Sequence, residues 1–207
     1  MPRLRDHISG DNYLDAHREQ LTSLAGDPIG QHKRVEIRRE YERLMLVQQQ
    51  LKEIDQDQRQ RIEVPQTPGD EKAALLVQLQ GVGPISASLL AHEFFWRDFA
   101  NRKQVGSAAG LVGTPFDSGN SEREQGISKI GNSLVRVIIS ELAWSWLRYQ
   151  PQSKLSQWFV ERYAPGSKRL RKVGIVALAR KLLIAMWRLV KYGEVPEGAL
   201  LKRPKPV

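Results

Sequence analysis

The chain has 207 residues, 41% of them hydrophobic and 27% charged, a composition typical of a globular protein with a buried core. It contains no cysteine, which excludes disulfide bridges, thiolate zinc sites and a cysteine nucleophile. The net charge of +9 is unevenly distributed, because residues 1–122 carry −3 and residues 123–207 carry +12. A basic half of this kind indicates a nucleic-acid-binding surface, although basic helix faces also occur for solubility alone.

Neither a membrane span nor a secretory signal is expected. Residues 73–92 form the one uncharged stretch that is long enough to raise the question. Gly81, Gly83 and Pro84 lie in its middle and would interrupt a spanning helix, leaving backbone groups unpaired in lipid. The N-terminal residues lead into no apolar segment with a cleavage site.

Residues 1–64 are predicted to form a polar N-terminal stretch followed by a coiled-coil helix or a long helical hairpin. Residues 33–62 contain no glycine or proline and consist mostly of helix-forming residues. Apolar residues recur there at spacings of three and four, which predicts a coiled-coil seam formed by Ile37, Tyr41, Leu44, Val47, Leu51 and Ile54. The seam needs a partner helix, either from a second copy, which means self-association, or from the same chain folded back.

The remainder is predicted to be a helical domain at residues 71–201, joined through a linker at 65–70 and followed by a disordered basic tail at 202–207. One amphipathic helix is indicated by apolar residues that recur every four positions: Leu134, Ile138, Leu142 and Trp146. A second helix begins near Ser153, and a third runs from about Leu170 to Tyr192 with Gly193 as its C-cap. No segment alternates as a strand would, so the predicted fold class is all-α.

The sequence Gly81-Val82-Gly83-Pro84 between two apolar helical segments is typical of a helix–hairpin–helix. Two glycines permit a sharp turn and leave amide groups at the start of the second helix open to a DNA phosphate. Contacts of this kind position a protein on DNA without reading sequence. A plain helical hairpin in a core has the same pattern.

Residues 110–132 contain five glycines and a proline, which predicts a structured loop. The loop carries three serines, Ser118, Ser121 and Ser128, among the cations Arg123 and Lys129, and Arg136 follows one turn into the next helix. A hydroxyl beside cations has the components of nucleophilic phosphoryl transfer, in which the cations offset charge on the phosphate. Composition alone favours the simpler interpretation, a serine- and glycine-rich loop without chemistry.

Over roughly residues 70–201 the sequence resembles the C-terminal transposase domain of the bridge-RNA-guided insertion-sequence recombinases. The resemblance rests on the Gly81–Pro84 motif, on Ser118-Gly119, on Gly126-Ile127-Ser128-Lys129-Ile130-Gly131-Asn132 and on residues 141–151 and 174–183. The helical seam before it resembles the coiled coil that precedes that domain.

The resemblance implies that Ser118 is the nucleophile that joins DNA covalently, with Ser121 a weaker candidate. It implies DNA and a guide RNA as partners, in a prokaryotic cytoplasm and in association with the nucleoid. Family members also begin with an RNase H-like domain whose four acidic residues bind divalent metal. No matching segment is found here, so metal is expected only on that separate domain and no metal ligand is assigned to this chain.

Three hypotheses follow. The first is a DNA-binding and strand-transfer domain in which Ser118 attacks a phosphodiester, with Gly81, Gly83, Arg123, Lys129 and Arg136 holding the DNA. The second is a helix–hairpin–helix DNA-binding module without chemistry. The third is a regulatory fragment that acts on intact recombinase copies through its coiled coil.

Overall fold

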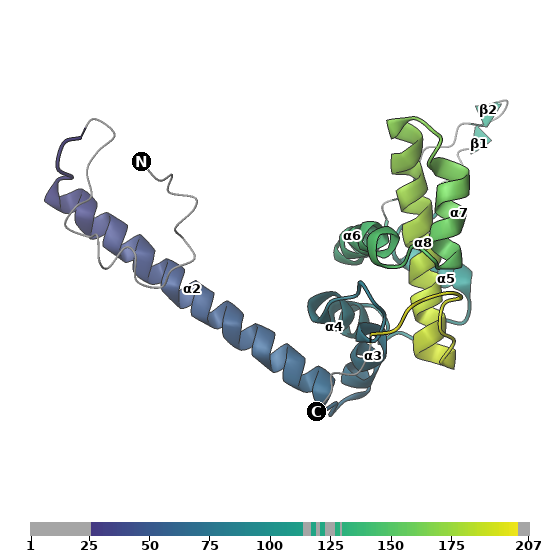
Figure 1. Ribbon diagram of the computed structural model, residues 1–207, viewed down its shortest axis with the longest axis horizontal. Helices are drawn as coiled ribbons and strands as arrows, with labels where there is room; N and C mark the ends of the chain where they lie inside the picture. The colour runs from purple at the N-terminus through teal and green to yellow at the C-terminus, as the bar shows by residue number, and fades with distance from the viewer. Residues whose placement is uncertain (1–25, 114–116, 119–120, 123–126, 129, 203–207) are drawn as a thin grey trace. The chain divides into compact units, whose positions relative to one another are not determined.

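The computed structural model describes residues 26–113, 117–118, 121–122, 127–128 and 130–202. Within these ranges the fold is all-α, as the sequence predicts, apart from two strands of two residues each (Figure 1). The chain divides into two compact units, residues 1–54 and 55–207. Among the described residues, no helix is both long enough and apolar enough to cross a membrane.

Helix α2 (Gln31–Glu63) is a single uninterrupted helix that includes the whole predicted seam. None of its residues is buried. Leu51 and Ile54 are 59% and 53% exposed, which leaves the apolar seam accessible for a partner helix. The structure therefore confirms the helix, and the identity of the partner stays a prediction.

The predicted linker at 65–70 is too long, because helix α3 (Pro68–Val77) already begins within it. The local sequence explains the early start. The Thr67 side chain accepts a hydrogen bond from the Asp70 amide, and the Asp70 carboxylate accepts one from the Thr67 amide, which together form a capping box. Pro68 fits the first turn, where its missing N–H is not needed.

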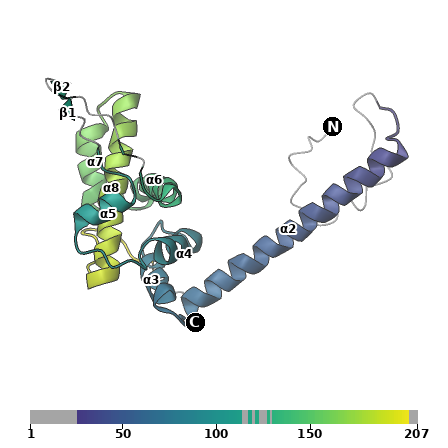
Figure 2. The ribbon, with the colours of Figure 1, turned by 180° about the vertical axis from the view of Figure 1, so that it is seen from behind.

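The second unit is built around helix α8 (Lys168–Tyr192). Helix α8 contacts α3, α5 (Arg102–Ala108), α6 (Ser133–Tyr149) and α7 (Lys154–Tyr163). Figures 1 and 2 both show α7 alongside α8, and α3 paired with α4 (Pro84–Glu93). The centre of the core is apolar, with Ile139, Trp146, Leu178, Leu182, Leu183 and Met186 all buried.

The helix ends in this unit follow local sequence rules. Side chains of Asn132, Ser153 and Ser167 accept backbone hydrogen bonds at the starts of α6, α7 and α8. Helix α8 ends at Gly193 in the left-handed conformation, as predicted. The predicted four-residue spacing within α6 holds for Leu142 and Trp146, which are buried, whereas Leu134 at its start is 48% exposed.

Candidate nucleic-acid interface

The loop predicted at residues 110–132 has a closed base. The Ser128 amide donates to the Val112 carbonyl at 2.9 Å, and Gly113 forms an antiparallel bridge with Ile127. Gly131 has φ +142°, and a Cβ atom added there would lie 2.5 Å from the Ala108 carbonyl oxygen. A larger residue would therefore push residue 131 away from Ala108, so the fold requires glycine at this position.

Ser118 lies in a short β-hairpin beyond this closed base. Strand β1 (Asp117–Ser118) pairs antiparallel with β2 (Ser121–Glu122), and Ser118 stands opposite Ser121. The two candidate nucleophiles are therefore cross-strand neighbours, a relation that the sequence pattern alone did not reveal. Arg123 and Lys129, the cations predicted to assist them, lie outside the described residues.

Arg136 lies at the base of the same loop. It is partly buried on the first turn of α6, and its Nη1 donates to the Ala109 carbonyl at 3.4 Å. This bond connects α6 with the chain segment that leads into the loop. Its predicted contact with DNA stays a prediction.

The predicted helix–hairpin–helix corresponds to α3, a turn at residues 78–83, and α4. Gly81 has φ +90°, and the three successive carbonyls of Gln80, Gly81 and Val82 all accept side-chain hydrogen bonds. The donors come from elsewhere in the second unit: Gln150 Nε2 at 2.9 Å, Ser145 Oγ at 2.9 Å and Lys202 Nζ at 2.7 Å, respectively.

Gly83, the N-cap of α4, differs from the N-cap residues of α3 and α5–α8 because no side-chain hydrogen bond caps the helix there. A Cβ atom added to Gly83 would meet nothing within 4 Å. The backbone at the start of α4 is therefore accessible from outside, which is the geometry that the DNA-contact hypothesis requires.

A basic groove of about 940 Å³ lies between α5 and α8 and extends to the base of the loop. Six cationic side chains line it: Arg102, Lys103, Arg169, Lys172, Arg180 and Lys181. No acidic residue lines the groove, and among the described residues none of the six cations forms an ion pair. This charge distribution favours a polyanionic ligand.

The sequence gives a partial signal for the basic groove. Arg169, Lys172, Val176 and Arg180 recur at spacings of three and four, which places them on one face of α8. The net charge of residues 123–207 indicated a basic surface without identifying this face. The contribution of Arg102 and Lys103 depends on tertiary packing of α5 against α8.

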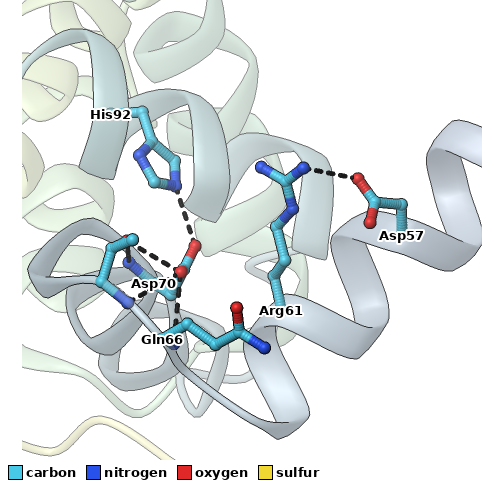
Figure 3. A network of polar contacts seen from close by, with 6 residues as sticks. Asp57, Arg61, Gln66, Asp70 and His92 are labelled. Carbon is cyan, nitrogen blue, oxygen red and sulfur yellow. Dashed lines mark hydrogen bonds and ion pairs between the residues drawn. The ribbon is translucent and has the colours of Figure 1, made fainter.

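A second pocket, of about 810 Å³, lies beside the start of α3. Figure 3 shows the polar contacts of Asp70, which lines this pocket. Its most buried ionisable group is Asp70, 3% exposed, whose carboxylate accepts from the Thr67 hydroxyl at 2.7 Å and the Thr67 amide at 3.0 Å. The Thr67 hydrogen bond is the main cause of the lowered pKa of Asp70. His92 Nε2 lies 3.3 Å from the same carboxylate. These partners assign Asp70 to the capping of α3 rather than to chemistry.

The described residues contain no cluster of acidic or histidine side chains of the size usual for a protein metal site. No group of three or more histidine, aspartate or glutamate side chains among them converges in a way that could hold an ion.

Comparison with known proteins finds similarity to transposases. Residues 73–157 match the model of the transposase IS116/IS110/IS902 family. The chain is 39% identical over 194 residues to "Putative transposase y4rJ" of Sinorhizobium fredii, covering 90% of this chain and 49% of that protein. It is 27% identical over 150 residues to the transposase for insertion sequence element IS1328 of Yersinia enterocolitica, covering 71% and 42% respectively. The chain thus spans about half the length of these relatives or less.

Proposed function

We propose that this chain, which carries a domain of the IS116/IS110/IS902 transposase family, acts as the DNA-binding and strand-transfer part of an insertion-sequence recombinase. In this proposal Ser118 is the nucleophile, and the basic groove holds the DNA strand on which it acts.

One observation carries the proposal. Gly113 and Ile127, the bridged pair at the base of the loop, also line the basic groove. The hairpin that bears Ser118 therefore arises from the edge of a surface with six cations, none of which forms an ion pair with another described residue. Phosphate contacts in such a groove would hold a DNA backbone next to the hairpin.

The proposed step is a displacement at phosphorus. The Ser118 oxygen forms a bond to the phosphorus atom, and the ester bond to one deoxyribose oxygen breaks. The serine hydroxyl loses one proton, and the departing oxygen takes up one proton and becomes a free hydroxyl, so the step releases no net proton. Arg123, Lys129 and Arg136 are proposed to offset the charge on the phosphate oxygens.

A serine hydroxyl is a weak nucleophile without an activating partner. We therefore expect the chain alone to bind DNA and to cleave it slowly or not at all. In the proposal, a guide RNA and a metal-bearing domain of a full-length recombinase complete the reaction, and no step of the displacement itself is assigned to metal on this chain.

The test mixes this chain with a full-length relative whose own hairpin serine has been replaced, together with guide RNA and labelled DNA. A denaturing gel should show a covalent protein–DNA species at the size of this chain. Ser118→Ala should abolish the species and change DNA affinity by no more than a few-fold, because the serine acts in the transition state. Ser121→Ala is the matched control. An adduct that survives Ser118→Ala and is lost with Ser121→Ala would refute the assignment.

A second candidate, a DNA-binding module without chemistry, is favoured by the accessible start of α4. Gly83→Val should weaken duplex binding about tenfold by preventing close approach of a phosphate to the backbone. Because a Cβ atom at Gly83 meets nothing within 4 Å, the variant should remain folded, with the poorer capping of α4 by valine as its main cost in stability. Gly30→Val, also in open space, is the control. Unchanged affinity of a folded Gly83→Val protein would exclude phosphate binding at the turn.

A further inference from the structure

The floor of the basic groove has a different chemistry from its rim. Besides the six cations, the groove is lined by apolar side chains of α8, including Val173, Val176 and Ile184, and by the indole of Trp158 on α7. Val173 is 55% exposed. Phosphates alone would gain nothing from this apolar floor, so the groove fits a ligand that presents both negative charge and apolar faces.

Duplex DNA does not present that combination, because its phosphates face outward while the faces of its bases are stacked inside. An unpaired strand exposes both, and proteins that bind single strands combine a basic groove with aromatic side chains on which bases stack. The cations of α8 extend from Arg169 to Lys181, about 18 Å of helix at 1.5 Å per residue. That length can follow several successive phosphates of one strand.

Trp158 is the only aromatic residue that lines this groove within the described part of the chain. Its indole is partly buried, and the ring of Tyr163 meets it edge-on with centroids 5.5 Å apart, which fixes its orientation. The ammonium group of Lys181 lies over the indole, 4.5 Å from the ring centroid. Lys181 is itself exposed, so it can leave the ring for a phosphate at low cost.

We propose that the basic groove binds an unpaired DNA strand, with one base stacked on Trp158 after Lys181 has moved from the indole to a phosphate. The inference deepens the proposed function and rests on it for the choice of DNA, because the groove adjoins the Ser118 hairpin. The groove would then receive the strand in an opened state rather than as intact duplex.

The test measures the affinity of the full chain for four labelled 12-nucleotide probes by fluorescence anisotropy. The probes are a single DNA strand, the same strand as a duplex, an abasic strand with the same number of phosphates, and RNA of the same sequence. We expect the single DNA strand to bind most tightly and the abasic strand about tenfold more weakly, since stacking on one aromatic side chain accounts for a factor of this order.

Variants locate the effect. Trp158→Leu should reduce single-strand affinity about tenfold and leave abasic-strand affinity unchanged, whereas Trp144→Leu, on exposed α6 surface away from the groove, should change neither. Lys181→Gln should weaken both probes and lower the salt dependence, whereas Arg171→Gln, on α8 but not lining the groove, should have little effect. Lys181→Gln also keeps the test valid if Trp158→Leu fails to fold.

Three results would overturn the inference while leaving DNA binding itself intact: tighter binding of duplex, equal binding of the abasic strand, or an unchanged affinity in folded Trp158→Leu. Tighter binding of RNA would overturn the assignment to DNA. Failure of the wild-type chain to bind any of the probes would overturn both this inference and the proposed function.

Discussion

Gln150 connects three segments of the second unit, and its removal has a measurable expected cost. Its side chain is fully buried at the C-terminal end of α6. Nε2 donates to the carbonyls of Gln80 at 2.9 Å and Leu200 at 2.8 Å, and Oε1 accepts from the Leu200 amide at 2.7 Å. Gln150→Ala removes all three hydrogen bonds. The Leu200 carbonyl keeps a partner, because the Gln80 amide also donates to it, but the Gln80 carbonyl and Leu200 amide lose theirs.

At about 1 kcal/mol net for each hydrogen bond, Gln150→Ala should lower the free energy of unfolding by about 3 kcal/mol. For a unit of this size, that corresponds to a fall in Tm of about 6–12 °C. Urea denaturation followed by circular dichroism, together with a thermal melt, measures both quantities.

The matched control is Gln157→Ala on α7, where an exposed side chain makes one long hydrogen bond, 3.3 Å from Nε2 to the Gln152 carbonyl. Its expected effect is within about 0.5 kcal/mol of zero. If the two alanine variants unfold with the same free energy, the buried hydrogen bonds of Gln150 do not stabilise the unit as argued.

Two further predictions concern α2 and α3. The double variant Val47→Glu with Leu51→Glu should convert a self-associated wild-type protein into a monomer in light scattering, because each apolar side chain contributes about 1.5–3 kcal/mol when fully buried. Gln50→Glu is the control. A wild-type protein that is monomeric at every concentration contradicts the prediction. The pKa of Asp70 is held low mainly by the Thr67 hydroxyl, so the carboxylate contributes its full stabilisation above its ordinary pKa of about 3.9 and loses it as the pH falls through the lowered value. Asp70→Asn should therefore lower the free energy of unfolding by about 1 kcal/mol at pH 7 and by progressively less in acid. Urea denaturation measures both values, and an equal loss at pH 7 and in strong acid would refute this origin of the stability.

The helices were predictable where local signals agree. The end of α8 at Gly193 follows from glycine at a C-cap, and the start of α7 after Ser153 follows from a serine N-cap. The linker prediction was wrong at Pro68–Asp70, because proline and glycine were interpreted as helix breakers. The capping box between Thr67 and Asp70 determines the outcome there.

The candidate site was less predictable, because its geometry depends on pairing and packing. The sequence identified a serine-bearing loop, but the register that sets Ser118 opposite Ser121 depends on the hairpin. Arg102 and Arg180 lie 78 positions apart in the sequence and line the same groove only because α5 packs on α8. Composition can indicate that a basic surface exists, but only the fold shows where on the protein this surface lies.

The turn at residues 78–83 has a consequence for the order in which the protein matures during synthesis. Its carbonyls are held by Ser145, Gln150 and Lys202, so the last of these partners leaves the ribosome about 120 residues after the turn itself. Domains made of contacts this distant in sequence form late, after the intervening chain has been translated. We therefore expect a nascent chain that has not reached Lys202 to lack the hydrogen bond to the Val82 carbonyl, so that the proposed phosphate-binding turn acquires its full set of partners only after translation through residue 202.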